Sequence, residues 1–166
     1  MKLSTREDIE APIAFVFGRI ADFDAWERSA LRRGAEVQRT DNLSRPGAGM
    51  AWRLRFSWRG KMRKADLALA DLEPPHRLAV TGEGANLGGR LDIELIEMSP
   101  RRTRMTVAIE LKPRTLTARL FLQSLKLAKA RLVKKLKART AQFAAEVERR
   151  HDPARERPSA HGQARR

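Results

Sequence analysis

Apolar and polar residues alternate along the central part of the chain. Apolar side chains fall at every second position over residues 52–58, 65–69, 78–80, 91–95 and 105–111. Successive side chains of a strand point to opposite faces of a sheet, so this period predicts strands with one apolar face. Residues 3–10 and 35–41 have the composition of two further strands. Because short turns join consecutive strands, we expect an antiparallel sheet of about six or seven strands.

Other segments repeat with the period of a helix. Residues 13–20 place four apolar side chains on one face directly after Pro12, a residue favoured in the first turn of a helix. A second short helix or turn is expected up to Leu31. Residues 116–149 contain neither proline nor glycine, and their apolar side chains share an arc of about 120°. This pattern predicts one long C-terminal helix with the apolar residues Phe121, Leu122, Leu125, Leu132, Val133, Leu136, Phe143 and Val147 against the sheet.

These elements predict an α+β fold in which a curved antiparallel sheet wraps around the C-terminal helix, with two short helices after the first strand. Residues 1–150 are expected to form one domain. Residues 151–166 are rich in Pro, Arg, Ser, Gly and Gln and have no apolar period, which predicts a disordered basic tail. Residues 82–89 contain four glycines and are expected to be a flexible connection between strands.

The inward-facing apolar side chains are candidates for lining a cavity between the sheet and the C-terminal helix. The same residues would equally fill a solid core, because apolar core and pocket residues look alike in sequence. Lys129 falls inside the apolar arc, so either its stem reaches outward to water or its ammonium points into the cavity. The candidate residues are Trp52, Leu54, Phe56, Trp58, Leu67, Leu69, Leu91, Ile93, Val107 and Ile109 from strands, and Phe121, Leu125 and Lys129 from the helix.

The positive charge of the chain is concentrated in one segment. The formal net charge is +15, and residues 112–145 hold ten cationic groups and no acidic group. Like charges four residues apart on a helix repel, so this segment needs its own explanation. Contact with an anionic membrane surface or acidic partner would provide one, through Lys126, Arg131, Lys134, Lys135, Lys137 and Arg139. An anionic ligand head group at the cavity mouth, or a general arginine bias of the proteome, would also account for the charge.

The residues that most catalytic or metal sites require are scarce. The chain has no cysteine or tyrosine and only three histidines. His76 lies in an expected turn, and His151 and His161 lie in the expected tail, so no histidine pair is placed for a metal site or a nucleophilic site. Asp22 and Asp24 are better explained as residues that cap a helix than as metal ligands. We therefore predict no metal, no cofactor and no catalytic residue, although a polar group in the cavity would leave an enzyme possible.

Two further patterns have simpler explanations than a binding site. The glycines of residues 82–89 lie between strands and lack the following helix and lysine of a phosphate-binding loop. Residues 52–59 mix aromatic residues with arginines, but alternation places the two kinds on opposite faces, whereas a stacking platform for single-stranded nucleic acid needs both on one face. Nucleic acid is therefore not the expected partner. The absence of cysteine, of a secretory signal pattern and of a long apolar run indicates a cytoplasmic protein, with the basic helix leaving peripheral association with a membrane open.

The residues around the first helix resemble a known superfamily. Ala11-Pro12-Ile13, Val16-Phe17 and residues 20–26 (Ile-Ala-Asp-Phe-Asp-Ala-Trp) are similar to the opening element of START-like proteins, also called SRPBCC or Bet v 1-like proteins. The turn at residues 73–78 (Glu-Pro-Pro-His-Arg-Leu) is similar as well. The resemblance covers about residues 1–150 and implies a helix-grip fold with a cavity between sheet and helix.

Members of this superfamily include lipid carriers, plant ligand-binding proteins, coenzyme Q-binding proteins and aromatase/cyclases. The resemblance therefore implies a binder or carrier of a hydrophobic molecule, such as a lipid, an isoprenoid quinone or a polycyclic compound. An enzyme of the cyclase or aromatase kind is the alternative within the same fold. An adaptor that acts on a membrane surface or a nucleic acid through the basic helix is the alternative outside it.

Overall fold

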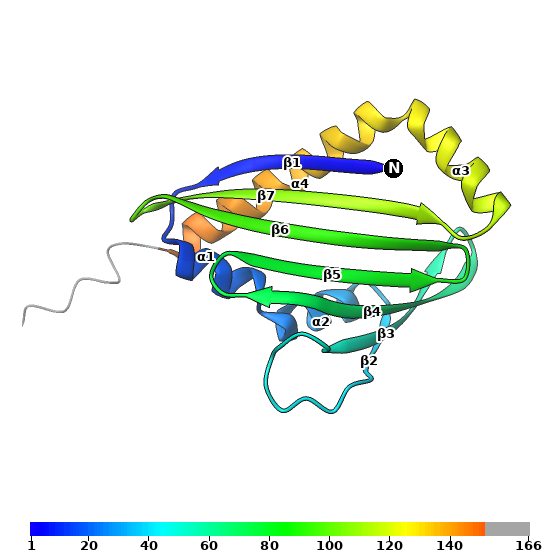
Figure 1. Cartoon of the computed structure of the whole chain (residues 1–166), viewed down its shortest axis with the longest axis horizontal. Helices are drawn as coiled ribbons and strands as arrows, with labels where there is room; N and C mark the ends of the chain where they lie inside the picture. Colours follow the sequence, from blue (N-terminus) through cyan, green and yellow to red (C-terminus); the bar gives the residue numbers. More distant parts are fainter. Residues whose placement is uncertain (152–166) are drawn as a thin grey trace, which may run out of the picture.

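The computed structural model describes residues 1–151 and shows one antiparallel sheet with helices behind it (Figure 1). Seven strands lie side by side in the order β1-β7-β6-β5-β4-β3-β2. The strands are β1 (Lys2–Ile9), β2 (Glu36–Arg39), β3 (Ala51–Trp58), β4 (Lys61–Glu73), β5 (Arg77–Gly84), β6 (Leu87–Ser99) and β7 (Arg102–Pro113). The helices are α1 (Ile13–Ile20), α2 (Phe23–Arg32), α3 (Leu116–Leu127) and α4 (Lys129–Arg150). The predicted fold class is confirmed.

The alternating residues form the apolar face of this sheet. In β3 and β4, Trp52 pairs with Leu67 and Leu54 with Ala65, while Arg53 pairs with Asp66 on the outer face. Each pair joins residues whose side chains lie on the same face of the sheet. The sheet therefore has one apolar face and one charged face, as the alternation predicts.

The core lies where α1, α2 and the second half of α4 cover the apolar face. Ile9, Ile20 and Leu78 are almost completely buried in it, and Ala144 and Val147 of α4 belong to the same cluster. A fully buried side chain of this kind contributes about 1.5–3 kcal/mol to stability. Burial of this cluster explains why α4 packs along β1 and crosses behind the sheet in Figure 1.

The prediction of one uninterrupted C-terminal helix is wrong at one residue. Ala128 leaves the helical conformation with φ −102° and ψ 13°, and it separates α3 from α4. A straight helix of this length would span about 50 Å at 1.5 Å per residue, longer than the strands it packs on. The break allows α4 to stay on the sheet near β1 while α3 turns toward the end of β7, at the right of Figure 1.

The glycine-rich segment is also more regular than predicted. Gly82 and Gly84 belong to β5, and Gly88 and Gly89 belong to β6, with Gly82 paired to Gly89. A Cβ atom on Gly88 would lie 2.8 Å from the Arg114 guanidinium, so a side chain there would displace the end of that arginine. The glycines thus belong to paired strands with close neighbours rather than to a flexible loop.

The predicted tail lies outside the described residues except for its first residue. His151 is 9% exposed and ends α4. Its ring contacts Phe15 of α1 edge-on, with 4.8 Å between the ring centroids. His151 is therefore part of the packing between α4 and α1. The prediction that it lies in a disordered tail is wrong.

Candidate functional site

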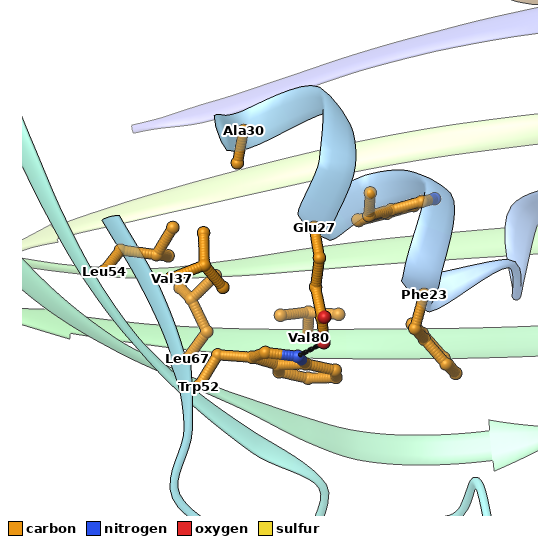
Figure 2. A pocket seen from close by; sticks show the side chains of 9 residues that line it. Phe23, Glu27, Ala30, Val37, Trp52, Leu54, Leu67 and Val80 are labelled. Atoms are coloured by element: carbon orange, nitrogen blue, oxygen red, sulfur yellow. Dashed lines mark hydrogen bonds between the residues drawn. The ribbon is translucent and has the colours of Figure 1, made fainter. Parts of the chain in front are cut away.

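A pocket of about 120 Å³ lies between α2 and the apolar face of the sheet. Figure 2 shows Phe23, Glu27 and Ala30 projecting from α2 above the strand residues that form the floor. The helix spacing explains this arrangement, because residues four and three apart share one face of a helix. The lining consists of Phe23, Trp26, Glu27, Ala30, Val37, Trp52, Leu54, Leu67 and Val80.

Glu27 provides the charged group of this apolar lining. Its Oε1 accepts a hydrogen bond from the indole Nε1–H of Trp52 at 2.7 Å, drawn as a dashed line in Figure 2. A carboxylate has about four acceptor positions on its two oxygens. Among residues 1–151, Trp52 is the hydrogen-bond donor to this group. The remaining acceptor positions of Glu27 have no hydrogen-bond donor from this part of the chain.

Trp52 is held in place from several sides. The guanidinium of Arg39 lies over its ring at 5.6 Å from the centroid, and the ring of Phe23 packs against it at 5.6 Å. Asp41 accepts two hydrogen bonds from Arg39, both at 2.7 Å, and one from the backbone N–H of Ala51 at 2.8 Å. These bonds hold the pKa of Asp41 far below its ordinary value, Arg39 being the largest cause. The Trp52 indole is therefore preoriented toward Glu27.

A second, polar hollow of about 300 Å³ lies on the other side of Phe23. It is bounded by the start of α2 and by the loop that joins β2 to β3. Phe23 lines both spaces and is 6% exposed, so this residue lies between them. The residues that line the polar hollow are Ala21, Asp22, Phe23, Asp24, Arg39, Leu43, Ser44, Arg45, Pro46 and Met50.

Three of the residues expected in a cavity, Trp52, Leu54 and Leu67, line the pocket under α2. Leu69, Ile93 and Val107 are buried in the core cluster, and Leu91 packs against that cluster. Phe56, Ile109, Phe121 and Leu125 are half-buried and lie outside this pocket. The pocket thus adjoins α2 rather than the C-terminal helices, because side chains of α4 fill the space on their side of the sheet.

Trp58 and Lys129 are placed differently from the expected cavity lining. Trp58 lies at the end of β3, is 45% exposed, and packs edge-on against Phe121 of α3 at 6.0 Å. Lys129 is exposed as the first residue of α4. The break at Ala128 ends the helical phase that placed Lys129 in the apolar arc, so its ammonium reaches water.

The cationic residues of the C-terminal helices form an exposed surface. All six that the sequence singles out are exposed, and none forms an ion pair with any residue of the described chain. No α3 or α4 residue belongs to the lining of the pocket under α2. A role for these cations in holding a ligand head group at the mouth of that pocket therefore has no geometric support. The six residues are Lys126, Arg131, Lys134, Lys135, Lys137 and Arg139.

The α2 residues of the pocket were not among the sequence candidates. Phe23, Glu27 and Ala30 follow the i, i+4, i+7 spacing of one helix face. An acidic residue inside an otherwise apolar stripe is the signal that would have identified this face. Val37 and Val80 complete the floor from β2 and β5.

The remaining polar candidates have structural positions. Asp22 accepts a hydrogen bond from the backbone N–H of Ala25 at 3.0 Å and caps α2, which confirms the expectation for this residue. His76 is exposed in the turn before β5. Within residues 1–151, no three His, Cys, Asp or Glu side chains are grouped to hold a metal ion. No helix in the same range is long and apolar enough to cross a membrane.

Comparison with known proteins gives matches at the level of structure. No model of a protein family and no curated protein matches the sequence. The Zhui aromatase/cyclase from Streptomyces sp. R1128 superposes with a TM-score of 0.63 at 15% identity, over 93% of this chain and 97% of that one. Ara h 8.0201 superposes with a TM-score of 0.58 at 11% identity, over 90% and 96% of the two chains. A START superfamily protein from Mycobacterium smegmatis does so with a TM-score of 0.53 at 16% identity, over 86% and 98%.

These similarities identify the fold. The chain has the START-like, or Bet v 1-like, helix-grip fold, and the resemblance seen around the first helix is confirmed at this level. The identities of 11–16% leave the activity to be argued from the site of this chain.

Proposed function

We propose that this protein binds the apolar part of a small molecule in the pocket under α2, with Glu27 accepting a hydrogen bond from the ligand. The observation that carries the proposal is the position of one carboxylate in an apolar lining, already oriented by Trp52 at 2.7 Å. Ligand pockets are typically apolar with a few placed polar groups that fix orientation. A lipid, an isoprenoid quinone or a polycyclic compound would provide the apolar part.

The size of the pocket limits what enters it in this conformation. An engineered cavity of about 150 Å³ in another protein accommodates one benzene molecule. The space of about 120 Å³ under α2 therefore suits one ring or one branched end of a longer chain. Sites for whole drug-sized ligands are larger, at about 300–1,000 Å³.

A larger ligand would need the two hollows to join. Phe23 lies between them, and rotation of its ring would connect the apolar pocket to the polar hollow beside it. The joined space would fall in the range of ordinary ligand sites. In that state an apolar body lies over Trp52 and a polar end reaches the loop that contains Arg45.

The chemistry of Glu27 defines the polar group of the ligand. A carboxylate accepts hydrogen bonds and repels anions, so it favours a hydroxyl, an amide N–H or an ammonium on the ligand. A ligand with a carboxylate at this position would place two negative charges together in an apolar site, which is unfavourable. The preferred ligand is therefore a neutral or cationic donor attached to an apolar ring or chain.

Four single-ring probes test this proposal by calorimetric titration: toluene, benzyl alcohol, benzylamine and benzoate. We expect benzyl alcohol and benzylamine to bind more tightly than toluene, and benzoate to bind at least about tenfold more weakly than benzylamine. The Glu27→Gln variant should lose most of the difference between benzylamine and benzoate while it binds toluene as before. Equal affinity of the intact protein for benzylamine and benzoate, or binding of none of the four probes, would contradict the proposal.

A second candidate function is contact with an anionic surface through α3 and α4. It is favoured by the exposure of six cationic residues in a segment of the chain that contains no acidic residue. Contacts between charges weaken as the salt concentration rises, because salt screens the charges from each other. The screening length is about 10 Å at 0.1 M salt. Binding to a heparin column should therefore require less salt for elution after Lys134→Gln and Lys137→Gln. The exposed pair Arg45→Gln and Arg101→Gln removes the same charge elsewhere and should change elution less.

A further inference from the structure

The helix α3 has an apolar face that nothing in the described chain covers. Leu127 is 93% exposed, Leu116 72% and Leu120 56%. At 100° per residue these three leucines fall within about 40° of one another around the helix. They lie along one side of the helix, with the exposed Gln123 between Leu120 and Leu127, and are called here the α3 ridge. Exposed apolar stripes of this kind mark sites of contact with a partner or a membrane.

The opposite face of α3 is already used for packing. Ala118 and Leu122 are buried, and Leu125 is half-buried. These residues lie about 140–180° away from the α3 ridge around the helix. α3 therefore contacts β7 through the face opposite the α3 ridge.

The β3–β4 hairpin adds apolar and cationic groups beside α3. Trp58 packs against Phe121, and Met62, on the other strand of the hairpin, is 60% exposed. The guanidinium of Arg59 lies over both rings, at 4.6 Å from the Trp58 centroid and 5.3 Å from that of Phe121. In Figure 1 this hairpin and α3 occupy the same end of the molecule, at the right. Exposed apolar side chains and arginines thus lie together at one end.

The charge around the α3 ridge identifies the kind of partner. Arg119 and Lys126 lie beside the leucines, both on the same side of α3, and further exposed cations follow on α4. A second copy of this chain would bring the same cations face to face, which is repulsive. A nucleic acid would bind the cations through its phosphates but would leave the exposed leucines of the α3 ridge in water. An anionic lipid bilayer satisfies both the leucines and the cations.

We propose that α3 and the β3–β4 hairpin dock on an anionic lipid bilayer, with the α3 ridge inserted at the boundary between head groups and acyl chains. This inference rests on the second candidate function, contact with an anionic surface, and names that surface. Leucines inserted to this depth leave water, while the neighbouring lysines and arginines stay at the level of the lipid phosphates. The break at Ala128 makes this geometry possible, because it turns α3 away from the sheet-bound α4.

The test is co-sedimentation of the full chain with vesicles of phosphatidylcholine alone or with about 30% phosphatidylserine. We expect at least about tenfold tighter binding to the anionic vesicles, and a steep loss of this binding between about 0.05 M and about 0.5 M salt. The variant Leu120→Ser/Leu127→Ser keeps all charges and should bind the anionic vesicles at least about tenfold more weakly than the intact protein.

A matched variant controls for the general effect of removing exposed apolar side chains. Ile96 and Met98 are exposed on β6, 55% and 47% respectively, away from α3. Ile96→Ser/Met98→Ser should bind anionic vesicles as the intact protein does. The circular dichroism spectrum and the unfolding temperature should be the same in both double variants as in the intact protein, which shows that each remains folded.

The possible contrary results separate the two levels of the proposal. Equal binding of the intact protein and Leu120→Ser/Leu127→Ser to anionic vesicles would overturn the insertion of the α3 ridge but leave the contact with an anionic surface. Equal binding to neutral and anionic vesicles would overturn the role of charge. Failure to bind any vesicle, together with tight binding to polyglutamate or to single-stranded RNA, would replace the bilayer with an acidic protein or a nucleic acid.

Discussion

Trp52 of β3 donates its indole N–H to Glu27 of α2 at 2.7 Å, across the pocket that lies between the helix and the sheet. Phe23 is the buried residue of α2, so few buried apolar contacts hold this helix on the sheet. The hydrogen bond between Trp52 and Glu27 is therefore a substantial part of what fixes the helix in position. It also orients the carboxylate on which our proposed ligand specificity depends. The same bond therefore links the stability of α2 to the chemistry of the pocket.

Replacement of Trp52 by Phe should destabilise the protein by about 1–3 kcal/mol, because it leaves a half-buried carboxylate without its donor. The measurement is the free energy of unfolding from urea titration. Removing both partners is less costly than removing one, since no polar group is then left unpaired. The double variant Trp52→Phe/Glu27→Leu should therefore be more stable than Trp52→Phe alone. A double variant less stable than either single variant would show that this bond has no such role.

Leu78 on β5 is fully buried at the centre of the core. Leu78→Ala should lower the free energy of unfolding by about 2–5 kcal/mol, because the lost contacts are accompanied by a residual cavity. Ile96 is 55% exposed on the neighbouring strand and serves as the control. Ile96→Ala should change stability by less than about 0.5 kcal/mol. Similar losses for both variants would mean that the sheet does not bury the face assigned to the core.

Three aspartates make the stability of the protein depend on pH. Hydrogen bonds from Arg39 and from the backbone N–H of Ala51 hold the pKa of Asp41 well below its ordinary value. Hydrogen bonds from Arg104 and Arg90 are the largest causes of the lowered pKa values of Asp8 and Asp92, respectively. In each case the folded state favours the ionised carboxylate more than the unfolded state does.

A lowered pKa in the folded state stabilises the protein above the ordinary aspartate pKa of about 4, and the stabilisation is lost as the pH falls below it. The unfolding temperature should therefore be nearly constant from about pH 7 to about pH 5 and should decrease below about pH 4. Asp41→Asn should lower the unfolding temperature at neutral pH and reduce the decrease in acid. A protein whose unfolding temperature rises from pH 5 to pH 3 would contradict these assignments.

Much of the fold follows from local patterns in the sequence. The period of two over residues 52–58 and 105–111 determines which side chains face the core, because a shift by one residue would expose all of them. The break at Ala128 has no such local signal, since alanine is a strong helix former. It results from the competition between α4, which is held along β1, and α3, which packs on β7 and the β3–β4 hairpin. Tertiary contacts of this kind are not visible in helical periodicity.

The site was only partly predictable for a similar reason. Trp52, Leu54 and Leu67 were identified because alternation places them on the inner face, but alternation does not say which part of that face is left unfilled. The filling depends on the side chains of α1, α2 and α4 together. Small Ala30 and the extended carboxylate of Glu27 leave space under α2, whereas Val147 and Phe143 occupy the space under α4.

The Trp52 indole N–H resonance, followed by ¹H–¹⁵N NMR during titration with benzyl alcohol, tests ligand binding under α2 most directly. The chain has three tryptophans, and Trp52→Phe assigns the signal. We predict a saturable shift of this resonance in the intact protein, and loss of that shift in Ala30→Phe, whose ring would fill the pocket. A Trp52 signal that stays unchanged in the intact protein, or that shifts equally in Ala30→Phe, would contradict binding at this site.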